Sequence, residues 1–157
     1  MDGVEKQHTY IEKGQIDLRE LIYRENGLAY EEYRDLRSSV EWLNFSEEQT
    51  RRALANSLYT VTVQEDAQTI AMGRLTGDGL YYLIVDVVVR PECQGRGIGS
   101  SIVDKLLAFV EAQTPVGGRS SVQLIAEKGK EEFYIKKGFK RIPHEYCGSG
   151  MRKVIRK

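Results

Sequence analysis

The residues best suited to carry chemistry form a glycine-rich turn, which reads Gln-Gly-Arg-Gly-Ile-Gly over residues 94–99. An apolar run over 81–89 precedes the turn, and an amphipathic segment over 98–112 follows it. Glycines let the backbone approach an anion closely and adopt dihedral angles that a Cβ atom disfavours. The N–H groups of a helix's first turn then point at that anion, and the helix dipole favours negative charge there. A strand, a glycine turn and a helix in this order predict a phosphate-binding site.

Two familiar phosphate-binding loops fit this turn poorly. A P-loop carries Gly-Lys followed by Ser or Thr, and the turn has no such lysine. A Rossmann turn carries G-x-G-x-x-G directly after its strand, whereas here the spacing is G-x-G-x-G and residues 90–93 come first. The structural alternative is a turn that only reverses the chain. Three alternating glycines at the start of a long helix disfavour that alternative.

Asp86 is a second candidate, because it is the one carboxylate inside the apolar run 81–89. An unpaired carboxylate is costly to bury, so Asp86 must have a partner or a function. As a function, a carboxylate in such a place could act as a general base. As a structural group, it would accept hydrogen bonds from nearby backbone or pair with an arginine. The sequence leaves these alternatives open.

The pattern of apolar residues predicts the elements that hold these groups. Strands are expected at 18–24, 58–64, 69–75, 80–89 and 121–126, with further candidates at 139–142 and 151–155. Helices are expected at 29–40, 46–55, 98–112 and 130–137. The unit from Leu80 to Ala126 should be a right-handed parallel crossover, while the other strands should be antiparallel. The run 80–89 is apolar at nearly every position, which predicts burial on both faces.

Composition restricts the class of protein. The chain has 157 residues, enough for one domain over 1–157, in which 1–17 is predicted to be a loose N-terminal extension. Formal net charge is +0, which predicts no nucleic-acid partner and no membrane-surface partner. No apolar run reaches the ~20 residues that span a bilayer. Cys93 and Cys147 lack metal-ligand spacing, so we expect no metal site and a cytoplasmic location.

Two motifs together resemble the GNAT superfamily of N-acetyltransferases. The segment from Val87 to Gly99 resembles that family's acetyl-CoA loop, and Gln94, Gly97 and Gly99 occupy the three motif positions. The segment 132–139, Glu-Phe-Tyr-Ile-Lys-Lys-Gly-Phe, resembles the family's FYxxxGF signature. The resemblance implies an α/β (α+β) fold with a mixed, mostly antiparallel twisted sheet of six to seven strands. About four helices should flank this sheet.

The resemblance also implies the co-substrate and where it binds. Acetyl-CoA would place its pyrophosphate on the loop and pair its pantetheine with the backbone of the preceding strand. The residues implied for coenzyme binding are Val87, Val88, Val89, Gln94, Gly95, Arg96, Gly97, Ile98, Gly99 and Ser100. Arg96 would add charge near the phosphates, or lie in solvent as an ordinary loop arginine.

The catalytic residues implied by the resemblance are Tyr134 and Asp86. Tyr134 matches the family's tyrosine that faces the leaving thiolate, and a hydroxyl donor there lowers the barrier. Asp86 matches an aspartate of some sugar-phosphate N-acetyltransferases, whereas others carry a glutamate where this chain has Leu83. Candidate acceptor-binding residues are Tyr33, Arg37 and Trp42.

We therefore expect an acetyl-CoA-dependent N-acetyltransferase that acts on a primary amine of a small molecule. A protein or peptide N-acetyltransferase is one alternative. A non-catalytic acyl-CoA-binding sensor of the same fold is another, although the retained Tyr134 favours an enzyme. A homodimer stays open, because dimers are common among such proteins.

Overall fold

The computed structural model describes residues 4–7, 10–12, 15–17 and 20–157. The chain forms two compact units, residues 1–124 and residues 125–157. The glycine turn and Asp86 belong to the first unit, and Tyr134 belongs to the second. The single domain expected over 1–157 stays a prediction. The loose extension expected over 1–17 lies partly outside the described residues, and the strands within it were not predicted.

The first unit is built on a six-stranded sheet in the order β1-β4-β5-β6-β7-β8. Its neighbours pair antiparallel, except that β7 and β8 are parallel. The mixed, mostly antiparallel sheet with one parallel crossover is thus confirmed. The strands of this sheet are Val4–Gln7, Leu21–Glu25, Tyr59–Glu65, Gln68–Gly77, Tyr81–Val89 and Ser121–Gln123. A separate two-stranded sheet joins β2 (Tyr10–Glu12) to β3 (Gln15–Asp17).

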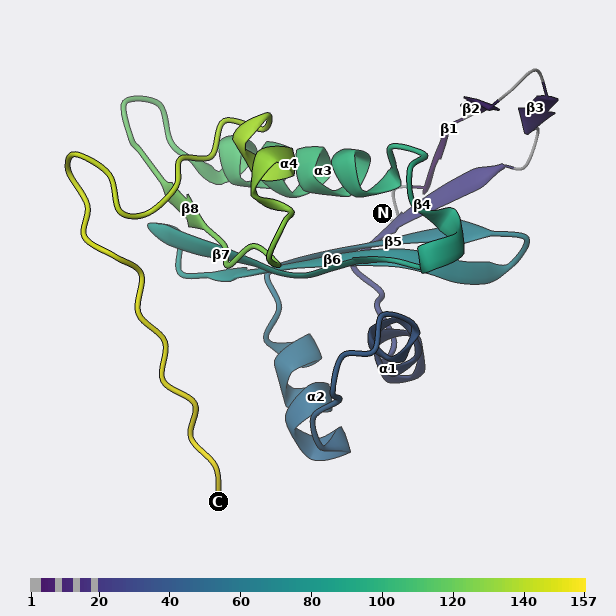
Figure 1. The fold of residues 1–157 in the computed structure, drawn as a ribbon, viewed down its shortest axis with the longest axis horizontal. Helices are drawn as coiled ribbons and strands as arrows, with labels where there is room; N and C mark the ends of the chain where they lie inside the picture. The colour runs from purple at the N-terminus through teal and green to yellow at the C-terminus, as the bar shows by residue number, and fades with distance from the viewer. Residues whose placement is uncertain (1–3, 8–9, 13–14, 18–19) are drawn as a thin grey trace. The chain divides into compact units, whose positions relative to one another are not determined.

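The helices lie close to their predicted positions. They are α1 (Tyr30–Ser39), α2 (Glu47–Ala55), α3 (Ile98–Gln113) and α4 (Glu131–Ile135), with a short 3-10 helix η1 at Pro91–Cys93. Ser46 caps the N-terminus of α2, because its side chain accepts the Gln49 N–H. In the first unit, α3 covers one face of the sheet, and α1 and α2 lie on the other (Figure 1).

The sheet has a packed core on each face. On the α3 side, the buried stripe of the helix contributes Ile98, Ile102, Val103, Leu106 and Val110, at the 3.6-residue period of an amphipathic helix. Gly73 of β6 lies under this stripe, because a Cβ atom there would be 2.4 Å from Ile102 Cγ2. On the α1 side, the cluster is Leu28, Tyr33, Leu36, Met72 and Val88.

Two expectations about strands were wrong. Residues 139–157, all described, contain no strand and only one isolated bridge, between His144 and Cys147. The predicted strands at 139–142 and 151–155 rested on two or three apolar residues each, too few to specify pairing without a partner edge. Nor is β7 buried on both faces, since Tyr81 is 62% exposed and Leu83 39%. On the face that carries α1 and α2, these two short helices leave the start of β7 uncovered.

Among the described residues, no helix combines the length and the apolar character that a membrane span needs.

Candidate functional site

The predicted phosphate-binding turn lies between η1 and α3. Gly95 and Gly97 have φ of +78° and +76°, in the left-handed region that glycine enters without a Cβ penalty. The Ser101 N–H donates to the Gly97 carbonyl at 3.0 Å and begins the bonding of α3. The N–H groups of residues 98–100 therefore precede intrahelical bonding and lie at the positive end of the helix dipole. This geometry fits an anion such as a pyrophosphate.

Arg96 in this turn is held by an acidic partner. Its guanidinium donates to both carboxylate oxygens of Glu65, at 2.5 and 3.2 Å. The Glu65 side chain is 5% exposed and that of Arg96 16%, so the pair is a buried, two-pronged contact of the strong kind. Arg96 is thus neither a solvated arginine nor an uncompensated charge. The bridge connects the turn to the end of β5.

Strand β7 has an open edge beside this turn. Its pairing with β8 covers only Tyr81 to Leu83, and Val87 to Val89 lie beyond it. Within the described part of the first unit, no strand pairs with those three residues on that side. The side-chain amide of Gln94 donates to the Val89 carbonyl at 3.0 Å. The open edge offers backbone groups that an extended ligand can pair with.

A β-bulge lies just before this open edge. Arg74 of β6 pairs with Val85, and Met72 pairs with Val88. Gly73 alone therefore lies opposite both Asp86 and Val87, the two-against-one pattern of a bulge. Asp86 has φ of +54°, a left-handed conformation that costs of order 1–3 kcal/mol for a residue other than glycine.

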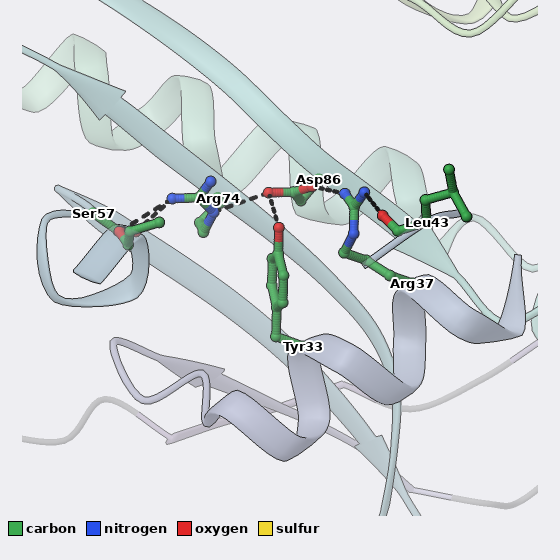
Figure 2. Close-up of polar contacts among 7 residues, drawn as sticks. Tyr33, Arg37, Leu43, Ser57, Arg74 and Asp86 are labelled. Carbon is green, nitrogen blue, oxygen red and sulfur yellow. Dashed lines mark hydrogen bonds and ion pairs between the residues drawn. The ribbon is translucent and has the colours of Figure 1, made fainter. Parts of the chain in front are cut away.

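The Asp86 carboxylate lies at the centre of a buried cluster (Figure 2). Arg37 Nη1 donates to its Oδ1 at 2.6 Å, and Arg74 Nε donates to its Oδ2 at 3.0 Å. The Tyr33 hydroxyl donates to Oδ2 at 3.2 Å. The side chains of Arg37 and Arg74 are each 10% exposed and that of Asp86 is 8%. The arginine-paired structural alternative for Asp86 is therefore present.

Each arginine of this cluster also reaches a further element. Arg37 Nη2 donates to the Leu43 carbonyl in the α1–α2 connector at 2.7 Å. Arg74 Nη1 donates to Ser57 Oγ at 3.0 Å and to the Ala53 carbonyl at 3.3 Å, at the end of α2. The Asp86 carboxylate is thereby connected, through two guanidinium groups, to both helices on this face.

Aromatic rings complete the surroundings of Arg37. The rings of Tyr33, Trp42 and Phe45 have their centroids 5.6, 5.2 and 5.0 Å from the Arg37 Cζ, within cation–π range. Burial and the Asp86 carboxylate raise the pKa of Tyr33, so this phenol stays protonated and donates. The three predicted acceptor-binding residues thus lie together: Tyr33 and Arg37 contact Asp86, and the Trp42 ring lies against Arg37.

Sequence reasoning missed Arg74, Phe45 and Ser57 as members of this cluster. A signal existed for Arg74, since it is the one charged residue of the apolar segment 69–75, just as Asp86 is of 81–89. Two such lone opposite charges on consecutive predicted antiparallel strands favour a cross-strand pair. No comparable signal marked Phe45, which reaches the cluster from the α1–α2 connector, or Ser57, which reaches it from the segment between α2 and β5.

These contacts bear on the predicted base. A carboxylate offers roughly four acceptor positions, and three donors already occupy both oxygens of Asp86. Only about one acceptor position therefore remains for a proton. The base role of Asp86 stays a prediction, and the geometry favours its structural alternative.

Tyr134 lies in α4, in the second unit. Its ring makes edge-to-face contacts with Phe133 and Phe139, with centroids 4.9 and 5.9 Å apart. Burial, and after it the Glu127 carboxylate, raise the pKa of Tyr134. The phenol therefore stays protonated at neutral pH, as a proton donor must. Its predicted catalytic role is consistent with this state.

Across the part of the chain that the structure describes, no group of three or more His, Cys, Asp or Glu side chains is placed to hold a metal ion.

The fold, the turn and the open edge define the class, and comparison with known proteins identifies it. Residues 23–155 match the family described as Acetyltransferase (GNAT) domain. The chain therefore belongs to the GNAT acetyltransferase family.

The similar proteins agree with this family. The chain is 36% identical over 108 residues to "Serotonin N-acetyltransferase 2, chloroplastic" of Oryza sativa subsp. japonica. The matched region covers 65% of this chain and 52% of the rice protein. The match thus spans about half of that relative's length. A probable acetyltransferase of meticillin-resistant Staphylococcus aureus has a TM-score of 0.74 at 27% identity, over 85% of this chain and 99% of that one. A GNAT family protein of Streptococcus pneumoniae has a TM-score of 0.72 at 26% identity, over 87% of this chain and 99% of that one.

Proposed function

We propose that this protein is an acetyl-CoA-dependent N-acetyltransferase, which transfers acetyl directly from the thioester to a primary amine of a small molecule. The observation that carries the proposal is the N-terminus of α3 beside the open edge of β7. The N–H groups of residues 98–100 suit a pyrophosphate, and the backbone of Val87 to Val89 suits an extended pantetheine chain. Membership of the GNAT family supports the same reading.

In the proposed reaction, the chain's residues manage two protons. The acceptor amine loses a proton to a base, which is water or Asp86, and its lone pair attacks the thioester carbonyl. The C–N bond forms, the C–S bond breaks, the sulfur leaves with the electron pair, and the nitrogen loses a second proton, which replaces the one that Tyr134 gives to the sulfur. Tyr134, protonated at neutral pH, donates a proton or a hydrogen bond to that sulfur. The products are the N-acetylated amine and free coenzyme A.

For the acceptor, an aromatic monoamine is the first class to test. The rice relative is named for serotonin, and the rings of Tyr33, Trp42 and Phe45 gather at Arg37. Phe45 is 57% exposed, so its ring is accessible to a ligand. The cytoplasmic location and the homodimer remain predictions.

The test is thiol release from acetyl-CoA with an amine panel: aromatic monoamines, amino acids, polyamines, aminosugars, aminoglycosides and lysine peptides. Direct binding of coenzyme A is measured alongside. We expect turnover with at least one small amine. Turnover with peptides alone would support the protein acetyltransferase, and binding without any turnover would support the sensor. Failure to bind acetyl-CoA would refute all three.

A further inference from the structure

The bulge in β7 determines which face of the sheet the end of this strand presents. Val85 and Val88 pair with Arg74 and Met72, which are two residues apart in β6 and share one face. Val85 and Val88 are three apart, so regular alternation would send Val88 to the opposite face. The extra residue of the bulge shifts the alternation by one position, so that Val88 faces the same side of the sheet as Val85. Val88, 3% exposed, thereby joins the α1-side cluster with Met72 and Leu36.

Asp86 is the residue at which this correction is made. Its backbone is left-handed, at φ +54°, and among L-residues aspartate tolerates that region better than most. Its side chain is fastened from α1 by Arg37 and Tyr33, and from β6 by Arg74. Backbone and side chain of one residue thus tie the bulge to two other elements. Figure 2 shows these three donors converging on the carboxylate.

We propose that Asp86 is a positioning residue: together with Arg37 and Arg74 it holds the bulge, so that the backbone of Val87 to Val89 stays available as a coenzyme-binding edge. The coenzyme part of this inference rests on the proposed function. The positioning itself is a property of the folded chain and does not depend on any ligand.

The same cluster connects the coenzyme-binding edge of β7 to the α1–α2 connector, on the side of the fold where the acceptor is proposed to bind. Arg37 donates to Asp86 with one nitrogen and to the Leu43 carbonyl of the α1–α2 connector with another. A ligand that orders the connector therefore also restrains Asp86, and through it Val87 to Val89. Because coupling between two sites is reciprocal, the acceptor and acetyl-CoA should each tighten the binding of the other.

The decisive measurement is amide hydrogen exchange of Val87 to Val89 in the ligand-free protein, with Asp86→Asn, Asp86→Ala and Arg37→Met compared with wild type. We expect exchange there to accelerate by about tenfold or more in Asp86→Ala and Arg37→Met, and less in Asp86→Asn, because Asn keeps the left-handed backbone and one acceptor. Glu65→Gln is the matched control. It removes charge from the other buried acid and should accelerate exchange in the 94–97 turn only.

Affinity and pH measurements then separate positioning from base catalysis. For a positioning residue, Kd for coenzyme A rises by about tenfold in Arg37→Met, which leaves Asp86 itself intact. In Asp86→Asn the pH dependence of kcat keeps its shape.

Wild-type exchange at Val87 to Val89 in both Asp86→Asn and Arg37→Met would overturn the inference, whatever becomes of Asp86→Ala. A shifted pH profile with unchanged exchange and unchanged coenzyme affinity would overturn it in favour of a base. If the wild-type protein binds no coenzyme A, the proposed function fails, yet the exchange experiment still decides the positioning role.

Discussion

The glycine turn and the Asp86 cluster differ in how the chain builds them. The turn uses consecutive residues, and its donors are backbone N–H groups at the start of α3. The cluster joins Tyr33 and Arg37 of α1, Arg74 of β6 and Asp86 of β7, and Asp86 lies 49 residues from Arg37. A site built from the N–H groups of consecutive residues can be encoded by local sequence. A cluster of side chains from distant elements forms only after the sheet and helices have assembled.

The two regions also differ in charge balance. Arg96 and Glu65 form a one-to-one buried pair. Asp86 faces two guanidinium groups, so those three side chains carry a formal charge of +2 −1 = +1. The rings around Arg37 help to offset this surplus. The turn should therefore tolerate loss of its charges better than the cluster does.

The largest expected effect is that of Asp86→Ala on stability. It leaves two buried guanidinium groups without their shared anion, which should lower the free energy of unfolding by about 3–5 kcal/mol. Urea unfolding measures this loss. Glu92→Ala, which removes an exposed carboxylate near the turn, is the control and should change little. A loss below 1 kcal/mol for Asp86→Ala would mean that the cluster does not hold the fold.

Next in size is the effect of Tyr134→Phe on turnover. Removing the proposed proton donor should lower kcat by roughly 10²-fold, with Kd for acetyl-CoA largely kept. Steady-state kinetics at saturating substrates measure kcat, and equilibrium binding measures Kd. Phe keeps the ring contacts of Tyr134, so unchanged turnover would exclude the hydroxyl from the mechanism.

Gly73→Ala tests the packing opposite the bulge. The new Cβ would lie 2.4 Å from Ile102 Cγ2, and such overpacking costs about 1–3 kcal/mol. The matched control is Gly27→Ala, because a Cβ there has no neighbour within 4 Å. Thermal or urea unfolding of the two variants compares them directly. Equal stability would show that α3 can shift away from β6 at no cost.

Arg96→Met should have a smaller effect on the coenzyme than its position suggests. Glu65 already neutralises this guanidinium, and the backbone N–H groups carry the anion in our proposal. We expect Kd for coenzyme A to rise less than about tenfold. Calorimetry at two salt concentrations would measure this rise in Kd. A rise of several hundredfold would show that Arg96 leaves Glu65 for a phosphate.

The smallest expected effect concerns the pH dependence of kcat. Burial and Glu127 raise the pKa of Tyr134, so its proton is fully present below the ordinary tyrosine pKa of about 10 and is lost only above it. The rate should therefore show no basic limb from this group below pH 10. A basic limb near pH 8 that disappears in Tyr134→Phe would contradict this assignment.

Much of the fold could be predicted because local signals and burial agreed. Helix α2 formed where the sequence predicted a helix, with Ser46 as its cap, and the stripe from Ile98 to Val110 faces the core. The strands expected at 139–142 and 151–155 failed because short apolar segments do not choose a partner by themselves. Within the candidate site, Tyr33, Arg37 and Trp42 could be selected by residue type, but Arg74 was missed because its contact with Asp86 depends on strand register.

The sequence by itself determined the glycine turn, the helix that follows it and the family they indicate, because these features depend on neighbouring residues and on backbone geometry. Only the tertiary structure decided what Asp86 and Arg96 contact. Both are charged residues in apolar or loop surroundings, and a charge acquires its partner from whichever distant element folds against it. The bulge in β7 turned Asp86 toward Arg37 and Arg74, and the end of β5 brought Glu65 to Arg96.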